Sequence, residues 1–473
     1  MINFIIEHLY NFMNYFSASW YHWNQWLLLT VLLGTLLFGV DDLIIDCLAY
    51  LKSLFPKKIS EKEKHELLTK PEKKMAIMIP AWDEGEVIFA TLRGNVKQIN
   101  YSNYHIYVGV YPNDPTTIEF AKKAQKLYPQ VIPVINTKPG PTSKGQMLNL
   151  MVRYILDEEK KSKEPYAGIL MQDAEDSIHP LILKLGNDAL EKADFVQTPV
   201  FSLPINLWQL TGGTYKDEFA ESHTKDLLVR SRLQAGVPSA GVGTFLGRNL
   251  CESYIKQNLD LFPEDSLTED YELGLNSSFK GFNSTFICAY YMKEKNQKEF
   301  IATREYFPKK MGAAIRQKTR WNAGIILQGW ERIGWQKGFV KNLFLWRDRK
   351  GILTHFLTFL GYFTLLSTML YEIAFPKQSI EMLLSIKYID IILYLCFFMG
   401  LNRFIQRLIC TYRVYGLMTT LFIPVRWPVA VIVNFCSIIK AIGRYTRSKL
   451  LSQKMKWGKT THEIPVEFLE EKK

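Results

Sequence analysis

The first 51 residues contain no lysine and no arginine. A removable signal peptide begins with basic residues and ends at a small-residue cleavage site, and neither feature is present. The segment is instead almost wholly apolar over Trp26 to Val40 and again over Leu43 to Leu51, which is enough for one helix of membrane-spanning length. We therefore expect a retained signal anchor. Because charges at mid-bilayer are costly, we place its acids near the cytoplasmic boundary, with a proton relay as the alternative: Asp41, Asp42 and Asp46.

The chain also lacks the sequence patterns of several other classes of site. It shows no Walker A loop, no internal repeat and no Cys/His zinc spacing. Its six cysteines are scattered without paired spacing, as expected for a reduced cytoplasmic domain and helix packing. The net charge of +12 is concentrated beside apolar segments. Anionic lipid headgroups explain that placement more simply than nucleic acid, so we expect a bilayer partner and no nucleic-acid partner.

Basic residues beside the apolar segments predict the topology. Lys52 to Lys74 is rich in lysine and should be cytoplasmic, which puts the N-terminus in the periplasm. The next apolar blocks, Ile352 to Phe375 and Tyr388 to Leu401, are followed by basic residues that again favour the inside. Two further spans fit this pattern, so we expect three spans in all. The C-terminus would be cytoplasmic.

The last apolar block, Tyr415 to Ile439, differs from the others. It contains Arg426 between two prolines, and both of its flanks are basic. An interfacial or re-entrant broken helix therefore fits better than a fourth crossing. The segment just before it, residues 402–413, has the pattern of an amphipathic interface helix.

Between residues 75 and 200, short apolar runs alternate with longer mixed segments, as in a parallel sheet covered by helices. Polar residues follow each run, at the strand ends where open α/β sheets bind ligands. The expected strands are Met75 to Ile79, His105 to Val110, Val131 to Ile135 and Ala167 to Met171.

The acids Asp173, Glu175 and Asp176 follow the last of these strands directly. At least two of their carboxylates can converge on one hard divalent cation, Mg²⁺ or Mn²⁺, which would bridge phosphate oxygens. The alternative is a plain acidic turn, which is common at strand ends. Lys144, at the start of an expected helix, neutralises phosphate or is merely solvated.

Two further segments carry candidate chemistry. Gly241 and Gly243 allow a close backbone approach, although a tight turn explains them equally. The triplet Thr268-Glu269-Asp270 opens an expected helix, so a carboxylate there is either a helix cap or a general base.

The run from Arg316 to Trp321 follows that triplet by about fifty residues and precedes a long apolar segment. It supplies Gln317, a cation at Arg320 and the flat face of Trp321, which suit a diphosphate leaving group and a sugar ring. Either motif alone is weak, because acidic triplets cap helices and Arg-Trp pairs stack on surfaces. Their order along the chain predicts a membrane glycosyltransferase.

With these residues assembled, the chain resembles the membrane-integrated family 2 glycosyltransferases, the group of cellulose and hyaluronan synthases. The resemblance implies a GT-A-like nucleotide-sugar-binding domain. It assigns a nucleotide-binding role to Pro80, Ala81, Glu84, Asp114, Lys144, Asn149 and Asp173. It assigns the metal to Asp173, Glu175 and Asp176, catalysis to Asp270 and Glu269, and the acceptor and diphosphate to Gly241, Gly243, Gln317, Arg320 and Trp321. The metal motif has Glu175 where the family pattern has Asp, and the membrane segments are few for a polymer channel.

A closer resemblance is to the transferase portion of the phage-adsorption protein B family of bacterial inner-membrane proteins. It rests on ordered phrases along most of the chain, which include Tyr111 to Pro115, Gly140 to Lys144, Asp173 to Asp176, Val237 to Thr244, Ser266 to Tyr271, Arg304 to Pro308, Arg316 to Trp321, Leu345 to Gly351 and Trp457 to Pro465. The resemblance implies transfer of an N-acetylated hexosamine from a UDP-sugar into a surface polysaccharide, with an envelope export partner. In that family a region associated with cyclic di-GMP follows the transferase. This chain ends after Trp457 to Pro465, so we expect no direct cyclic di-GMP control.

The predicted protein is an inverting, metal-dependent family 2 glycosyltransferase with an α/β GT-A-like cytoplasmic domain and transmembrane helices. We divide it into an anchor (1–55), a basic linker (56–74), the transferase domain with interface helices (75–345), C-terminal membrane or interfacial helices (346–450) and a tail (451–473). Two alternatives stay open. One is a single-addition transferase acting on a lipid-linked acceptor, and the other is a non-catalytic receptor or assembly component of the envelope.

Overall fold

The computed structural model describes residues 2–294, 297–375, 388–452, 464–465 and 468. The expected tail, 451–473, and the phrase Trp457 to Pro465 therefore lie mostly outside the described residues. Four helices in the described part are long and apolar enough to cross a membrane by length and composition. They are α1 (Ile2–Leu51), α14 (Gly351–Ala374), α15 (Ile389–Leu421) and α16 (Ile423–Leu450).

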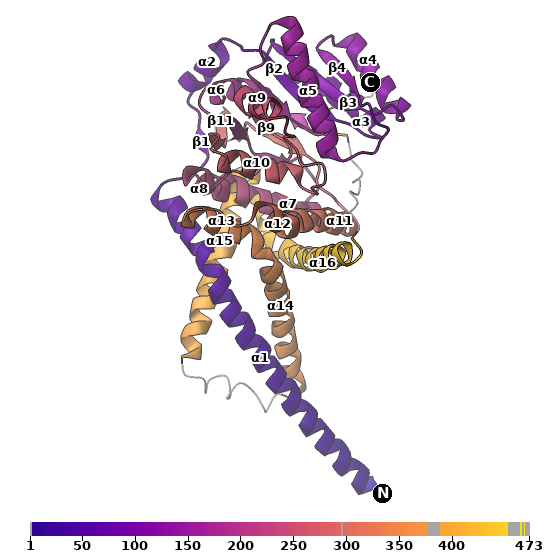
Figure 1. The fold of residues 1–473 in the computed structure, drawn as a ribbon. Helices are drawn as coiled ribbons and strands as arrows, with labels where there is room; N and C mark the ends of the chain where they lie inside the picture. Colours follow the sequence, from indigo (N-terminus) through magenta and orange to yellow (C-terminus); the bar gives the residue numbers. More distant parts are fainter. Residues whose placement is uncertain (1, 295–296, 376–387, 453–463, 466–467, 469–473) are drawn as a thin grey trace, which may run out of the picture.

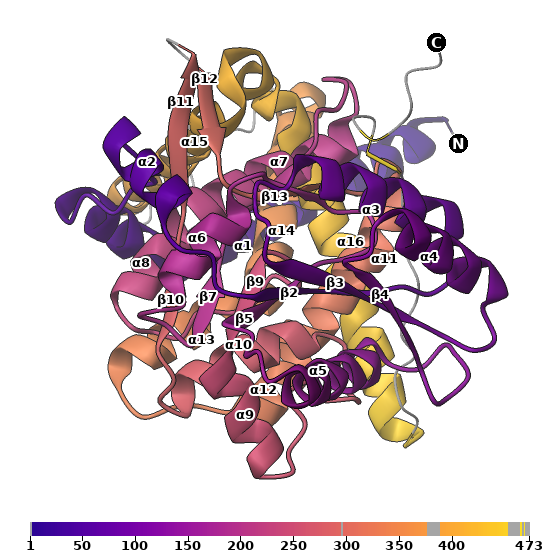
Figure 2. The same cartoon turned by 90° about the horizontal axis from the view of Figure 1, so that it is seen from above.

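Three of these helices extend away from the α/β domain, and the fourth does not. Figure 1 shows α1, α14 and α15 leading down from the domain, whereas α16 lies crosswise beneath it. The view from above in Figure 2 shows α16 running along its length under the domain. This placement agrees with the interfacial helix expected for Tyr415 to Ile439, although α16 also meets the length and hydropathy criteria for a span.

The separate interface helix expected at 402–413 is wrong. Those residues continue α15 without a break, and the first non-helical backbone is at Gly416, where φ is 76°. Two of the basic residues that favoured an interface helix instead face acids of neighbouring helices. Arg403 contacts Asp42 at 2.6 Å and Arg407 contacts Glu221 at 2.5 Å.

A seven-stranded sheet forms the centre of the α/β domain, in the order β10-β7-β9-β5-β2-β3-β4. The four expected strands are confirmed as parallel neighbours. They are β2 (Met75–Pro80), β3 (Tyr104–Val110), β4 (Val131–Ile135) and β5 (Gly168–Met171). The other half contains β7 (Phe195–Gln197), β9 (Thr244–Gly247) and β10 (Ser284–Phe286). The α/β class predicted from the sequence is confirmed.

Alternate residues of β2 face two different cores, as the period of a strand requires. Ile77 and Ile79 pack with α3 (Gly85–Gln98) and α4 (Pro115–Leu127), whereas Ala76 and Met78 pack with α5 (Lys144–Ser162). Both faces of the strand are therefore buried. The remaining helices of this domain are α2 (Glu61–Thr69), α6 (Ile182–Ala189), α7 (Leu210–Glu221), α8 (Leu227–Arg232), α9 (Arg248–Lys256) and α10 (Glu269–Phe279).

The strand β9 runs antiparallel to both of its neighbours, β5 and β7. The residues before β9 consequently meet the same sheet edge as the residues after β5. Two small sheets flank this edge. One contains β6 (Ser177–Ile178), β13 (Thr303–Glu305) and β8 (Val200–Ser202), and the other contains β1 (Lys57–Lys58), β11 (Ala289–Glu294) and β12 (Gln297–Phe300).

A long interrupted helix separates the sheet from the membrane-length helices. It consists of α11 (Met311–Trp321), a π-helical stretch η2 (Asn322–Gln328) and α12 (Gly329–Ile333). The helix α13 (Phe339–Arg349) follows, and a second π-helical stretch, η1 (Ser222–Asp226), joins α7 to α8. The helix α11 packs on both α7 and α16.

The acids of the N-terminal anchor have cationic partners where α1 meets the domain. Asp41 and Asp42 contact Arg347 at 2.6 and 2.8 Å, and Lys350 at 2.7 and 3.1 Å. Asp46 contacts Lys225 at 2.5 Å. These acids therefore stabilise a junction between α1 and the transferase domain, a role that accounts for their presence without a proton relay.

We predict that the two ends of the chain lie on opposite sides of the membrane, because three helices leave the domain and α16 lies crosswise. Fusions of a topology reporter before α1 and after Leu450 should report the periplasm and the cytoplasm, respectively. A fusion after Phe375, between α14 and α15, is the internal control and should match the N-terminal fusion. If the fusions at the two ends report the same side, α16 is a fourth span and the three-span topology is wrong.

A candidate active site at the carboxyl ends of the strands

Acidic residues follow β5 at the edge where the parallel strands end, as the sequence predicted. The carboxylate of Asp176 is fully buried and accepts a hydrogen bond from the backbone N–H of Asp173 at 2.6 Å. The Asp173 side chain keeps 30% of its surface exposed and binds the ammonium of Lys144 at 2.5 Å. The two carboxylates thus differ in role, because Asp176 shapes the turn while Asp173 faces the site.

Burial, together with the nearby carboxylates of Glu305, Asp173 and Glu175, raises the pKa of Asp176 well above its ordinary value. A low-dielectric environment disfavours the charged form of an acid, and like charges add to this effect. Glu305 lies in the phrase Arg304 to Pro308, to which the sequence analysis gave no function. The structure makes it the fourth acid near this turn.

Lys144 is the first residue of α5, directly after the N-cap Ser143. Burial alone would favour the neutral amine, but the carboxylates of Asp173, Glu269 and Asp270 raise the pKa of Lys144 above its ordinary value. One ammonium therefore interacts with acids from two distant parts of the chain. This arrangement excludes the merely solvated lysine that the sequence left open.

Glu269 and Asp270 are the first residues of α10 and lie beside Lys144. The hydrogen bonds at the start of that helix bear on whether the triplet caps the helix or supplies a general base. Thr268 occupies the N-cap position, yet its side chain makes no capping hydrogen bond. Asp270 Oδ1 accepts from the backbone N–H of Tyr271 at 2.8 Å. Its other oxygen, Oδ2, lies 2.6 Å from the position that a Cβ on Gly241 would take. The backbone of Gly241 has a φ of +84°, so a glycine there both permits the turn and leaves room for the carboxylate.

The loop that contains Gly241 and Gly243, called the glycine loop below, is held in place by two glutamines that the sequence analysis did not select. Gln172, just after β5, accepts from Gly243 N at 3.3 Å and donates to Thr303 Oγ1 at 2.9 Å. Gln197, at the end of β7, accepts from Ala240 N at 2.9 Å and donates to Val242 O at 2.8 Å. Gln172 directly follows β5 and Gln197 is the last residue of β7, and both strands end at this edge. A polar residue at the end of a strand is the sequence signal that could have identified them.

The helix α11 brings part of its predicted motif to the acids. Arg320 donates to the carbonyl of Leu267 at 3.3 Å, directly beside the acidic triplet. At the end of the π-helical stretch, Gln328 accepts from the N–H of the same Leu267 at 3.0 Å. Within η2, Gly324 approaches Thr268 so closely that an added Cβ would lie 2.5 Å from the threonine hydroxyl. The interrupted helix therefore contacts Leu267, directly before the triplet, at two points and Thr268 at a third.

Trp321 and Gln317 lie in different surroundings on this helix. Trp321 packs edge-on against Tyr215 of α7, with ring centroids 5.9 Å apart, in a cluster that also holds Phe307. The carbonyl oxygen of Gln317 is buried, and the structure gives it no hydrogen-bond partner. A buried polar atom of this kind is costly unless something binds it, so Gln317 Oε1 marks a position where a ligand donor fits.

The expected nucleotide turn is held by its own contacts. Pro80 ends β2, Ala81 is buried, and the backbone N–H of Glu84 donates to Thr117 Oγ1 at 3.0 Å. Asp114 accepts from the N–H groups of Asp83 at 2.6 Å and of Thr117 at 3.1 Å. Its carboxylate thus joins the turn after β2 to the start of α4, which is the role the structure shows for it.

Asn149 lies one turn into α5, and both ends of its amide contact a single residue. It donates to the carbonyl of Phe262 at 2.8 Å and accepts from the N–H of Phe262 at 3.0 Å. The structure therefore gives Asn149 a positioning role for the loop around Phe262.

The three predicted metal ligands do not converge in this arrangement. Within the described residues, no group of three or more His, Cys, Asp or Glu side chains is placed to hold a metal ion. Asp173 alone offers a partly exposed carboxylate, and its partner is the ammonium of Lys144. The donor set suits a cation at Asp173, and a divalent ion there would have to replace or join Lys144.

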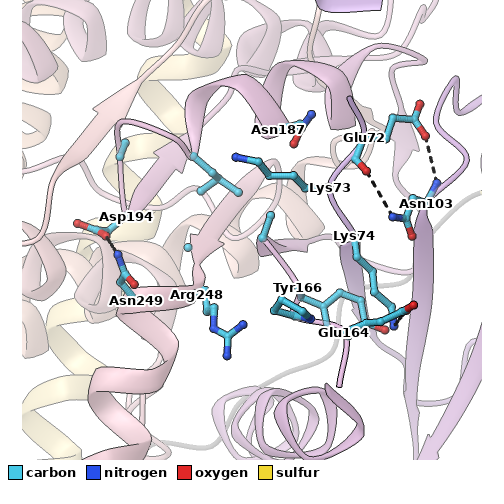
Figure 3. Close-up of a pocket in the computed structure, with 15 residues that line it drawn as sticks. Glu72, Lys73, Lys74, Asn103, Glu164, Tyr166, Asn187, Asp194, Arg248 and Asn249 are labelled. Carbon is cyan, nitrogen blue, oxygen red and sulfur yellow. Dashed lines mark hydrogen bonds and ion pairs between the residues drawn. The ribbon is translucent and has the colours of Figure 1, made fainter. Parts of the chain in front are cut away.

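A hollow of about 580 Å³ lies at the opposite edge of the sheet, where β2, β3, β5 and β7 begin. Figure 3 shows its lining, in which Lys74 lies beside Glu164 and Asn249 is joined to Asp194. Lys74 pairs with Glu164 at 3.1 Å, and Arg248 pairs with Glu252 at 2.6 Å. Because these charges are already balanced and the acids of the predicted site are absent, we do not place the active site here.

Comparisons with known proteins find similar sequences over most of the chain. Residues 71–324 match the family model described as glycosyltransferase like family 2. The chain is 33% identical over 472 residues to the bacteriophage adsorption protein B of Escherichia coli strain K12 and, equally, to the bacteriophage N4 adsorption protein B of Escherichia coli O157:H7. Each match covers 95% of this chain and 63% of the relative, so the chain spans less than two thirds of the length of these relatives.

Among solved structures, the fold is similar to a mannosyltransferase from Pyrobaculum calidifontis in complex with GDP-Man and Mn²⁺. The TM-score is 0.49 at 12% identity, over 87% of this chain and 99% of that one. A glucosyl-3-phosphoglycerate synthase from Mycobacterium tuberculosis in complex with UDP matches with a TM-score of 0.30 at 12% identity, over 52% of this chain and 81% of that one.

The pair Glu269 and Asp270 predicts a pH dependence of stability. Burial and the neighbouring Asp270 raise the pKa of Glu269 from 4.5 to about 7. The folded state therefore holds the proton more tightly than the unfolded chain does. The stability that the protonated Glu269 contributes is fully present below about pH 4.5 and is lost as the pH rises through about 7.

The free energy of unfolding of the wild type should consequently fall between about pH 5 and pH 8, and Glu269→Gln, which stays neutral, should remove this part of the fall. The measurement is thermal unfolding in detergent at a series of pH values. The exposed Glu264 provides the control variant Glu264→Gln, which should keep the wild-type profile. An unchanged profile in Glu269→Gln would contradict the buried, protonated assignment.

Proposed function

The chain belongs to the family 2 glycosyltransferases, and on this premise we propose that it transfers a sugar from a UDP-sugar to a hydroxyl group of a glycan acceptor at the inner membrane. The observation that carries this proposal is the buried carboxylate pair at the start of α10, placed between the glycine loop and the Lys144–Asp173 pair. Its α/β domain is a GT-A-like nucleotide-sugar fold.

We assign the general base to Asp270. Its Oδ2 points at the glycine loop, where no side chain intervenes, and its Oδ1 is fixed by the N–H of Tyr271. An acceptor hydroxyl would attack the anomeric carbon as its proton passes to Asp270, and the bond from that carbon to the diphosphate oxygen would break. UDP leaves with the electron pair, so the configuration inverts and no covalent enzyme-sugar intermediate forms.

The raised pKa of Asp270 supports this role. Burial raises the pKa of the Asp270 carboxyl, and only part of this effect is offset by Lys144, the N–H of Tyr271 and Arg320. A carboxylate that binds protons more strongly than an exposed one is a better acceptor for a hydroxyl proton at neutral pH. Glu269 is the second titrating member of this pair, and we propose that it tunes the charge around the base.

The leaving diphosphate would be bound by the cations of the site. Lys144 lies at the N-terminus of α5, where the helix dipole also favours an anion. Arg320 provides a second cation beside the triplet. A divalent cation at Asp173, with Glu175 as the second carboxylate, would supply further stabilisation of the leaving charge when bound. We do not assign Asp176 to that cation, because its fully buried carboxylate already accepts from the N–H of Asp173.

The acceptor would approach from the side of α11. This helix carries Trp321 and packs against the crosswise α16, so the acceptor end of the site lies toward the membrane-length helices. We propose a growing surface or secreted polysaccharide as the acceptor, with an N-acetylated hexosamine as the transferred sugar, on the strength of the likeness to the adsorption proteins B. Product length after incubation with donor distinguishes this acceptor from a lipid-linked acceptor that receives a single sugar.

Replacement of the proposed base separates an enzyme from a scaffold. Asp270→Asn keeps the shape of the side chain and its hydrogen bond to Tyr271, but cannot take the proton, so UDP release should fall by about 10²- to 10⁴-fold. Donor affinity should stay close to that of the wild type. The exposed Asp265 provides the control variant Asp265→Asn, which should retain turnover. Near-normal UDP release from Asp270→Asn would refute the assignment of the base.

Metal dependence is tested at Asp173. If a divalent cation binds there, Asp173→Asn should lower both UDP-sugar affinity and turnover, and EDTA should abolish wild-type activity until Mg²⁺ or Mn²⁺ is restored. Lys144→Met provides the comparison, because it removes the competing ammonium and should leave a requirement for the metal. Full activity of the wild type in EDTA would remove the metal from the mechanism and leave Lys144 and Arg320 as the cations that bind the diphosphate.

A further inference from the structure

A groove of about 470 Å³ lies between α15 and the hairpin formed by β11 and β12, away from the transferase site. Figure 2 shows this hairpin standing beside α15. The hairpin contributes Lys298, and the helix contributes the rest of the lining, namely Leu408, Ile409, Tyr412, Arg413 and Thr420. We call these six residues the hairpin groove. Its walls are apolar, and its only charged residues are two cations.

The two cations of the hairpin groove are supported by aromatic rings and lack acidic partners. The Arg413 guanidinium lies 4.4 Å from the centroid of the Phe55 ring, and Lys298 Nζ lies 5.3 Å from that of Tyr290. Across the described residues, neither cation takes part in an ion pair within 4 Å. Partial burial and the charge of Arg413 lower the pKa of Lys298. The fold therefore holds two like charges together without compensation.

Two other cations of α15 do have acidic partners. Arg403 and Arg407, about three and two turns earlier, contact Asp42 and Glu221 within 2.6 Å. Those arginines hold the helices together. Arg413 has no such partner on the described part of the chain, so its charge is available to a ligand.

The apolar surface around the groove continues toward the C-terminal end of α15. Tyr412 is 57% exposed, and Leu417 and Met418 beside it are 55% and 67% exposed. A soluble anion needs hydrogen-bond donors on several sides, and besides the two cations the lining offers only the hydroxyl groups of Tyr412 and Thr420. Apolar walls with two cations at one place instead match an amphiphile that carries one phosphate and acyl chains.

We propose that the hairpin groove binds an anionic phospholipid, with the phosphate between Arg413 and Lys298 and the acyl chains along Leu408, Ile409 and Tyr412. The guanidinium would bind two phosphate oxygens at once, and the ammonium would act as a point charge. The lipid would join the hairpin to α15 at a place where the described residues form no ion pair. This site is independent of the proposed transferase chemistry.

The test is native mass spectrometry of the full chain in detergent, titrated with phosphatidylglycerol or with phosphatidylcholine of the same acyl chains. Each cation near a membrane surface contributes about 1 kcal/mol toward an anionic lipid, so Lys298→Gln/Arg413→Gln should weaken the affinity for phosphatidylglycerol by about 30-fold. The charge-preserving Lys298→Arg/Arg413→Lys should retain it. Phosphatidylcholine should bind weakly to every variant.

The matched control is Lys293→Gln/Lys440→Gln, which removes two exposed cations outside the groove and should bind phosphatidylglycerol like the wild type. Equal affinity of Lys298→Gln/Arg413→Gln and wild type for phosphatidylglycerol would overturn the proposal, as would equal retention of phosphatidylcholine. Displacement of the bound lipid by millimolar inorganic phosphate would assign the cations to free phosphate instead and would also overturn it. A thermal unfolding curve for each variant shows that the fold is intact.

Discussion

The ion cluster between α1 and α13 is the interaction on which the rest of the structure depends. Asp41 and Asp42 on the first membrane-length helix meet Arg347 and Lys350 at distances of 2.6 to 3.1 Å. Charges held in a partly buried place are tolerated only when they are paired, and removal of one partner leaves the others uncompensated. Between these two cations lies Asp348, which accepts from Tyr271 OH at 2.7 Å and from Arg230 at 2.8 Å. One turn of α13 thus connects the anchor to the residue that follows the proposed base.

A second buried ion pair fixes the crosswise helix. Arg426 of α16 binds Asp217 of α7 through two hydrogen bonds of 2.8 Å, with both side chains almost fully buried. Gly213 leaves the space that the arginine occupies, because an added Cβ there would lie 2.3 Å from the Arg426 side chain. The sequence drew attention to Arg426 as an obstacle to a span. The structure shows that the same residue ties α16 to the transferase domain and so sets the direction of the helix.

The sequence predicted the fold where local patterns decide it and failed where distant partners decide it. The strands β2 to β5 are short apolar runs with polar ends, so their positions and their shared edge followed from pattern alone. The antiparallel β9 carried no local signal of its direction. The basic residues of 402–413 suggested an interface helix because their acidic partners, Asp42 and Glu221, lie more than 180 positions earlier in the chain.

The residues of the candidate site were likewise predicted where motifs mark them, whereas their individual roles depend on distant partners. Asp173, Lys144, Glu269, Asp270 and Arg320 were predicted from motifs, and the structure brings all of them together. Motifs could not show how each side chain is used. Asn149 and Asp114 hold backbone groups, Asp176 supports its own turn, and Gln172 and Gln197 brace the glycine loop from strand ends that no motif marks.

The π-helical stretch after Trp321 constrains the length of the chain as well as its composition. In a regular α-helix, residues eight positions apart differ in direction by about 80°, yet Arg320 and Gln328 contact the carbonyl and the N–H of the same residue, Leu267. The wider turns of η2 bring the two side chains to that common point. Deletion of one residue from 322–328 would turn every later residue of the helix by about 100°. Leu267, directly before the triplet, would then keep its contact with Arg320 or with Gln328 but not both. This stretch therefore tolerates exchange of side chains more readily than a change in the number of residues.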